Sequence, residues 1–158
     1  MPKTQFWLMK SEPDCFSIDD LERKGIDHWD GVRNYQARNF MRDQMRIGDR
    51  VLFYHSSARP IGIAGLARVH SEAYPDPTAW DPSNSHFDPL ASPENPRWCM
   101  VDVEFVEKFP EILTLEEMHR NPSLEGLLVL KRGMRLSIQP VEKKHFDEIL
   151  KMVRNRKK

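Results

Sequence analysis

Short apolar and alternating runs along the chain predict β-strands. Residues 6–10 form a mostly apolar run that ends at Ser11, Glu12 and Pro13, which predicts a buried first strand leading into a loop. The same reasoning predicts further strands at residues 50–55, 61–69, 98–106 and 135–141.

The strands at 50–55 and 61–69 are separated by only a short connection, so we expect a hairpin. Gly62 and Gly65 fall within the second of these strands. They predict a β-bulge or a close backbone approach, as a small curved barrel requires.

Helical spacing and capping residues predict helices over residues 17–24, 34–45 and 142–154, with shorter helical turns at 114–119 and 123–127. The first of these helices begins at Ser17, which forms a capping-box pattern with Asp20, and Gly25 supplies its stop. Asn34 is a suitable N-cap for the second.

Two segments lack either periodicity. Residues 29–31 read as a turn, and residues 71–97 hold prolines and carboxylates in a long loop. Long loops inside compact domains are commonly functional, so we expect the second segment to act as a lid over a site.

Strands interrupted by short helices, without regular βαβ alternation, predict an α+β domain. We expect a small, curved, mostly antiparallel β-barrel flanked by helices, and a single domain over residues 1–158. No glycine-rich phosphate loop is present, so a Rossmann or P-loop enzyme is not expected.

Composition indicates a globular chain, with 39% hydrophobic and 30% charged residues. No apolar run approaches the roughly 20 residues of a membrane-spanning helix, and residues 1–6 lack a hydrophobic signal-peptide region. We therefore expect a soluble, cytoplasmic protein, or a nuclear one if eukaryotic, with no membrane partner.

The metal-binding residue types show no ligand pattern. Cys15 and Cys99 are too few for a disulfide framework or a zinc site, and we expect both to be plain, at least half-buried thiols. The six histidines lack metal-ligand spacings. We assign no metal and no cofactor.

The formal net charge is zero, since the chain has 24 Lys and Arg residues and 24 Asp and Glu residues. Nucleic-acid binding must therefore depend on a local basic patch. Arg38, Arg42 and Arg46 recur every four residues of a predicted helix, which would align them in one stripe. The stripe is either a solvated face or an edge that contacts phosphates. Further candidates for phosphate contacts are Arg33 and a basic tail made of Arg154, Arg156, Lys157 and Lys158.

Aromatic and polar residues gather where predicted strands end and loops begin. They occur at residues 10–13, at Trp29 with residues 33–35, and at residues 53–56. Strand ends converge in a small barrel, so these segments would form a pocket with flat aromatic walls and a few hydrogen-bonding groups. Such a pocket suits a planar heterocycle.

The same segments resemble a known family. The blocks are FWLMKSEP at residues 6–13, WDGVRNYQARN at 29–39, Gly48-Asp49 with FYHS at 53–56, and RLSIQPV at 135–141. In order and spacing they are similar to the EVE domain, over essentially the whole chain. The resemblance implies membership of the PUA-like superfamily, whose small β-barrels include the YTH readers of N6-methyladenosine.

The resemblance also implies a function without catalysis, namely binding of modified nucleobases, such as 5-methylcytosine derivatives in DNA, in an aromatic-lined pocket. Ser11 and Trp29 match positions that line the base pocket in YTH-type relatives. Trp80 in the long loop is a candidate second wall. The remaining candidates for stacking and for hydrogen bonds to the base edge are Glu12, Asn34, Tyr35, Tyr54, His55 and Ser56.

Two alternatives remain open at this point. Asp102 and Glu104 project from the same side of a predicted strand, so they form either a solvated face or a carboxylate pair for metal-dependent phosphodiester chemistry. The pocket could also hold a free nucleoside or another small molecule. The choice between DNA and RNA and the oligomeric state are not predicted.

Overall fold

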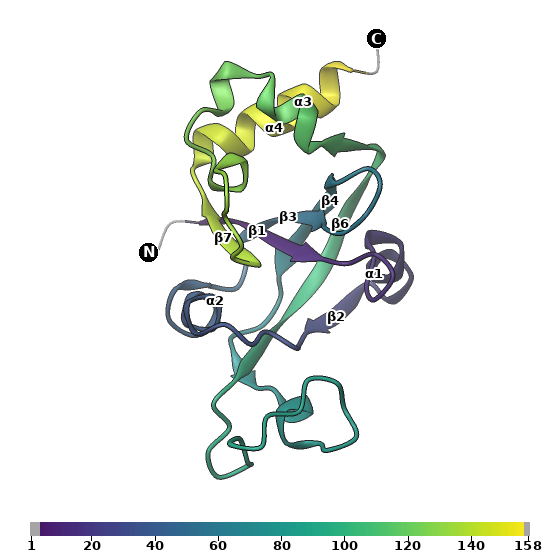
Figure 1. Cartoon of the computed structure of the whole chain (residues 1–158). Helices are drawn as coiled ribbons and strands as arrows, with labels where there is room; N and C mark the ends of the chain where they lie inside the picture. Colours follow the sequence, from purple (N-terminus) through teal and green to yellow (C-terminus); the bar gives the residue numbers. More distant parts are fainter. Residues whose placement is uncertain (1–3, 157–158) are drawn as a thin grey trace.

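A computed structural model gives the fold of residues 4–156. One sheet dominates it (Figure 1). Its strands are β1 (Phe6–Ser11), β2 (Ile26–Trp29), β3 (Arg50–His55), β4 (Gly62–Val69), β5 (Tyr74–Pro75), β6 (Cys99–Thr114) and β7 (Ile138–Val141). The order across the sheet is β2-β6-β4-β3-β1-β7, and β5 pairs with β6. Neighbouring strands are antiparallel, except that β1 and β3 are parallel.

The predicted α+β class is confirmed, but the sheet is not closed into the expected barrel. Within residues 4–156, β2 pairs only with β6 and β7 only with β1. The strand path therefore has two open ends. Closure would require β2 to pair with β7, and the β1–β7 and β2–β6 pairs lie at opposite ends of the path.

The bulge predicted around Gly62 and Gly65 is present. The β4 register shifts against β6 between Ile63 and Gly65. A Cβ atom on Gly62 or Gly65 would lie 2.1 or 2.3 Å from a backbone oxygen of β6. Both positions therefore require glycine because another strand passes so closely.

The sheet has a core on each face, because successive strand side chains point to opposite sides. On β1, Trp7 and Met9 join one buried cluster, whereas Leu8 joins the other. The first cluster includes residues of α1 (Ile18–Lys24) and α2 (Tyr35–Asn39). The second includes residues of α3 (Leu115–His119) and α4 (Lys143–Asn155). Figure 1 shows α3 and α4 together on one side of the sheet.

The helix predicted at 17–24 is confirmed as α1, with the Ser17–Asp20 capping box and Gly25 at its C-cap. The single helix predicted at 34–45 is wrong in its second half. There α2 gives way to a π-helical turn, Phe40–Gln44, in which the Met45 amide donates to the Phe40 carbonyl. The remaining short helices are the 3-10 turns Pro77–Trp80, Pro122–Leu124 and Leu128–Leu130.

Two strands were not predicted: β2, Ile26–Trp29, directly before the turn expected at residues 29–31, and the short β5 within the expected loop. Two predicted strands have other bounds, because β7 begins at Ile138 and β6 continues past residue 106 to Thr114. Pro110 made the longer strand hard to predict. Pro110 lies in β6 between Lys108 and Leu113, where the pairing with β4 is interrupted by the bulge. Proline has no N–H to donate, and at this point of the strand no regular ladder hydrogen bond requires one.

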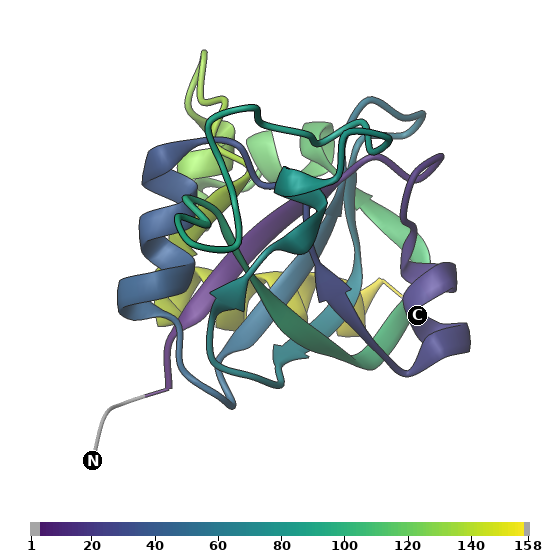
Figure 2. The same ribbon diagram turned by 90° about the horizontal axis from the view of Figure 1, so that it is seen from below.

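The long segment at residues 71–97 crosses in front of the sheet between α2 and α1 (Figure 2). No helix within residues 4–156 is long and apolar enough to cross a membrane.

Candidate functional site: a cavity at the ends of the parallel strands

The parallel pair β1 and β3 brings two of the predicted site segments together. Ser11, the last residue of β1, is in register with His55, the last residue of β3. The Ser56 amide donates to the Ser11 carbonyl at 2.9 Å. The expected convergence of these strand ends is confirmed, and crevices beyond the carboxyl ends of parallel strands are common ligand sites.

A cavity of about 500 Å³ opens beside these strand ends, and we call it the strand-end cavity. Its volume lies within the roughly 300–1,000 Å³ of small-molecule sites. It is lined by Lys10, Ser11, Glu12, Cys15, Phe16, Lys24, Asp27, His28, Trp29, Asp30, Gly31 and His86. Three predicted base-pocket residues, Ser11, Glu12 and Trp29, therefore meet here.

Trp29 gives the cavity an aromatic surface. Its ring packs edge-on against Phe53 and Phe16, with centroids 5.3 and 5.9 Å apart, so only 6% of the residue stays exposed. Among residues 4–156, no acceptor binds the Trp29 indole N–H, unlike that of Trp7, which donates to Asp49 at 3.0 Å. The Trp29 N–H is therefore available to a ligand.

Ser11 and Glu12 supply the polar side. The Ser11 hydroxyl donates to the Phe16 carbonyl at 2.6 Å and so fixes the turn that holds the Phe16 ring. Glu12 is exposed, and its carboxylate has no hydrogen-bond or ion-pair partner within the described range. Cys15, expected to be at least half-buried, is exposed, because this turn bends it away from the core; Cys99 is buried as expected.

His86 is a cavity residue that the sequence did not predict. It comes from the long loop and covers Gly31 so closely that a Cβ there would lie 2.6 Å from the imidazole. Gly31 also has φ of +77°, which side chains rarely adopt. The His86 Nδ1 atom is buried without a hydrogen-bond partner. The only sequence signal was Gly31 itself, which marks a close approach without naming its partner.

The loop is anchored under the cavity by Asp76, which is fully buried. Its carboxylate accepts from the Gly31 amide at 2.8 Å, from Arg33 at 3.1 Å and from Thr78. Burial alone would raise the pKa of Asp76, but the hydrogen bonds from Thr78, Gly31 and Arg33 hold it below its usual value. The expected lid is thus tied down here, and Arg33, predicted to bind phosphate, is engaged in this bridge.

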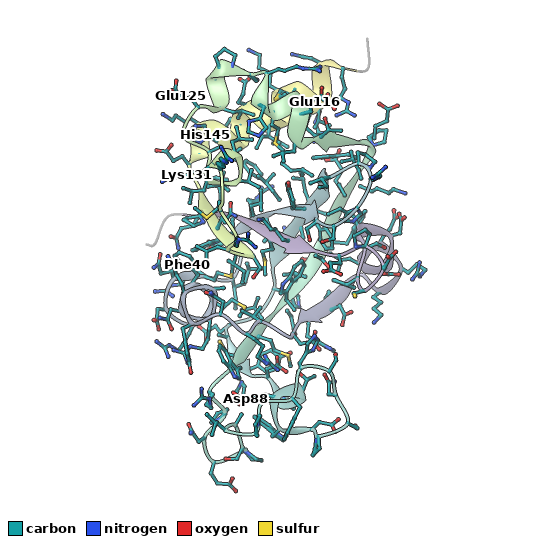
Figure 3. All side chains as sticks on the ribbon, viewed as in Figure 1. Phe40, Asp88, Glu116, Glu125, Lys131 and His145 are labelled. Atoms are coloured by element: carbon teal, nitrogen blue, oxygen red, sulfur yellow. The ribbon has the colours of Figure 1, made fainter. Side chains whose placement is uncertain are left out.

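A second anchor fixes the distal part of the loop. The Asp88 carboxylate, labelled in Figure 3, accepts from the Trp98 indole at 2.7 Å and from Arg97 at 3.1 Å. Trp80 packs against Ala79, Ala91 and Trp98 rather than lining the strand-end cavity. The other aromatic side chains that line the strand-end cavity with Trp29 are Phe16 and His86, and not Trp80 as expected.

The two remaining base-pocket candidates of the second sequence block lie elsewhere. Asn34 caps α2 by accepting from the Ala37 amide. Tyr35 stacks on Trp98 with ring centroids 4.8 Å apart.

A separate cavity of about 410 Å³ is lined by Arg38, Arg42, Arg97, Trp98 and neighbouring residues, and we call it the arginine cavity. The Arg38 guanidinium lies 4.7 Å from the Tyr35 ring centroid and has no carboxylate partner among the described residues.

The arginine stripe is only partly formed. Arg38 and Arg42 line the arginine cavity, but Arg46 does not. The helix ends before Arg46, because Met45 has an extended backbone and the Arg46 amide donates to the buried Asp49 carboxylate. Arg46 therefore does not continue the stripe of Arg38 and Arg42. In the basic tail, Arg154 pairs with Glu107 at 2.6 Å and Arg156 with Glu111 at 3.3 Å. Lys157 and Lys158 lie outside the described residues.

The three candidate residues of the FYHS block lie in two different places. His55 is buried on the side of the first core, where its Nε2 accepts from the Ile18 amide at 3.1 Å. Tyr54 and Ser56 line another cavity beside Lys10. Burial raises the pKa of Tyr54 to about 12.

His55 predicts a pH effect on stability. Burial lowers the pKa of His55 from 6.5; the Asp19 charge opposes this effect and the Lys108 charge adds to it, both more weakly than burial. Above pH 6.5 the ring is neutral in both states, and as the pH falls the unfolded chain takes up the proton first. The free energy of unfolding should therefore fall below pH 6.5, by at most about 1.4 kcal/mol per pH unit from this group.

His55→Gln retains an acceptor for Ile18 without the titration. Chemical denaturation at pH 7 and pH 5 should show a smaller pH dependence in this variant than in the wild type. Equal pH dependence would assign the effect to other groups.

The carboxylates of the alternative enzymatic site are each engaged. Glu104 pairs with Arg68 at 2.6 Å, and Asp102 accepts from the Tyr74 hydroxyl. Within residues 4–156, no group of three potential ligands is placed to hold a metal ion.

Taken together, the sheet and the strand-end cavity define an α+β protein with a ligand-sized cavity beyond its parallel strand pair. The EVE domain model matches residues 5–152, and the chain belongs to the EVE domain family. The resemblance inferred from the four sequence blocks is confirmed.

Relatives support this membership. Human thymocyte nuclear protein 1 is 43% identical over 164 residues, which cover 92% of this chain and 72% of the relative. A solved structure of a hypothetical protein from Leishmania major superposes with a TM-score of 0.94 at 45% identity, covering 99% and 98% of the two chains. The human THYN1 protein, solved in complex with 5-methylcytosine-containing DNA, superposes with a TM-score of 0.85 at 41% identity, covering 95% of this chain and 98% of that chain.

Proposed function

We propose that this protein is a non-catalytic module that binds DNA or RNA carrying a modified base, such as a 5-methylcytosine derivative. The main support is the human THYN1 structure, which shares 41% of its sequence with this chain and contains 5-methylcytosine DNA. The strand-end cavity is the proposed base site. It combines the Trp29 ring with the unpaired Glu12 carboxylate.

In this mechanism the nucleotide leaves the base stack and enters the cavity. The base stacks on aromatic surface, a contribution of roughly 1–3 kcal/mol. Glu12 accepts from an exocyclic amine, as carboxylates do from cytosine N4. Burial of one methyl group adds only about 0.8 kcal/mol, or about fourfold in affinity. Stronger selectivity for the mark requires a polar group, and His86 and the Trp29 N–H are the nearest candidates.

Fluorescence anisotropy tests the proposal with matched single- and double-stranded oligonucleotides. They carry cytosine, 5-methylcytosine, 5-hydroxymethylcytosine, adenine or N6-methyladenine. The expected result is tighter binding of one modified base than of its unmodified parent. Indifference to every modification would reject the proposal for these marks. Equal affinity for the free modified nucleoside and for the oligonucleotide would favour the alternative, a binder of free nucleosides.

Arg38 and Arg42 are proposed to contact a phosphate farther along the strand, because they line the arginine cavity. Arg38→Ala combined with Arg42→Ala should weaken oligonucleotide binding. It should also reduce the slope of log affinity against log salt by about 0.7–0.9 for each phosphate that the protein no longer neutralises.

The control is Arg68→Ala combined with Arg154→Ala, which removes the same charge from arginines outside the arginine cavity. Both are ion-paired, with Glu104 and Glu107, as Arg42 is with Asp43. The slope of this control should match the wild type. An unchanged slope in the Arg38 and Arg42 variant would reject the proposed phosphate contact.

A further inference from the structure

A third cavity lies directly beside the strand-end cavity, and Lys10 lines both. It has a volume of about 510 Å³, and we call it the lysine cavity. It is lined by Lys10, Tyr54, Ser56, Ser57, Ile61, Leu115, His119, Val129, Leu130, Lys131, Arg132, Gly133 and Met134. Lys131 sits on the connection that leads into β7 (Figure 3).

The two cavities lie on either side of the sheet at the end of β1. Lys10 follows Leu8 on the face of the second core, whereas Ser11 follows Met9 on the face of the first. A ligand that spans both cavities must pass over the last residues of β1 and β3. The strand-end and arginine cavities, in contrast, share no lining residue.

The lysine cavity is chemically suited to an anion. Three cations line it, Lys10, Lys131 and Arg132, and its lining includes no carboxylate. The Lys10 ammonium donates only to the Met134 carbonyl at 3.3 Å and has no acidic partner among residues 4–156. Burial lowers the pKa of Lys10, which indicates a charge that lacks compensation. A phosphate would supply that compensation.

The same cavity offers surface for a sugar or a base. Ile61, Leu115 and Val129 provide apolar walls. The Tyr54 hydroxyl has no hydrogen-bond partner within the described part of the chain and can bond a ligand. A nucleotide combines this mixture of anionic, polar and apolar groups.

We propose that the lysine cavity holds the nucleotide adjacent to the base in the strand-end cavity, with the phosphate between the two nucleotides at Lys10. This inference rests on the proposed function, because it needs a strand whose modified base occupies the first cavity. Recognition is then one-sided, since only the neighbour on one side of the modified base enters the lysine cavity.

The test uses single-stranded tetranucleotides that carry the preferred modified base at the 5′ end, at an internal position or at the 3′ end. For the wild type, one terminal placement should bind as tightly as the internal one. The other placement removes the neighbouring nucleotide and should bind at least about fivefold more weakly, as the loss of one stacked base predicts. Equal binding at both ends would overturn the inference.

Lys131→Ala combined with Arg132→Ala changes exposed side chains of the lysine cavity. This variant should reduce the difference between the two terminal placements, and it should keep its preference for the modified base over the unmodified one. Lys143→Ala combined with Lys144→Ala removes the same charge from exposed positions outside the cavities described above, and should behave as the wild type.

A Lys131 and Arg132 variant that retains the full difference would overturn the inference. Failure of the proposed function looks different, because the wild type would then show no preference for a modified base at any placement.

Discussion

Trp29→Leu should abolish most of the binding of a modified base while the protein remains folded. Trp29 lines the strand-end cavity together with Phe16 and His86, and removal of one stacking partner costs roughly 1–3 kcal/mol, or about 5- to 150-fold in affinity. The substitution also removes the ring packing on Phe16 and Phe53, so the stability of the variant must be followed by thermal unfolding. Binding is compared at a temperature where both proteins are folded.

The matched control is Trp80→Leu, the same change at a half-buried tryptophan outside the cavity. Its affinity should equal that of the wild type. If Trp80→Leu lost affinity and Trp29→Leu did not, the base would be read at the loop and not at the strand ends.

Among the substitutions considered for stability, Asp76→Ala should lower the free energy of unfolding most, by about 3 kcal/mol. Removing one partner of a buried ion pair typically costs about 3–5 kcal/mol, and the partly exposed Arg33 places this pair at the lower end. The Gly31 amide and Thr78 lose their acceptor as well. Because Asp76 holds the loop that brings His86 to the cavity, affinity for a modified base should fall with stability.

Asp81→Ala is the control for this effect. Asp81 is an exposed aspartate of the same loop whose side chain accepts from the amide and hydroxyl of Ser83. The Asp81→Ala variant should lose less than about 1 kcal/mol of unfolding free energy, because both of these hydrogen bonds are exposed to water. Similar losses for Asp76 and Asp81, measured by chemical denaturation, would contradict the assigned role of the Asp76 bridge.

Local patterns predicted much of this fold, because they depend on residues close in sequence. The capping box at Ser17 and the bulge at Gly65 are examples. The π-turn after α2 was not predictable in the same way. It depends partly on Asp49, whose buried carboxylate binds the Arg46 amide and the Trp7 indole and so shapes the chain beyond the helix.

The candidate site was predicted where it follows the strand ends and missed where it depends on the loop. The parallel register of β1 and β3 explains why Ser11 and Glu12 lie beside the strand ends. His86 could not be found from the sequence, since its position is set by the bridge from Asp76 to Gly31, 45 residues apart. The prediction that Tyr54 and His55 share one pocket was wrong. Successive side chains of β3 point to opposite faces of the sheet, so these two neighbours in sequence lie on different sides.

The four tryptophan indole N–H groups allow a direct test of whether a modified base occupies the strand-end cavity. They report on separate places: Trp29 on this cavity, Trp98 on the arginine cavity, Trp80 on the loop and Trp7 on the buried contact with Asp49. Their ¹H–¹⁵N signals, assigned by single Trp→Phe substitutions, would be followed while an oligonucleotide with 5-methylcytosine is added.

Binding of the base in the strand-end cavity should give a saturable shift of the Trp29 signal that is larger for the modified than for the unmodified oligonucleotide, with the Trp7 signal unchanged. An unmoved Trp29 signal at saturating oligonucleotide, with shifts confined to Trp80 or Trp98, would contradict it.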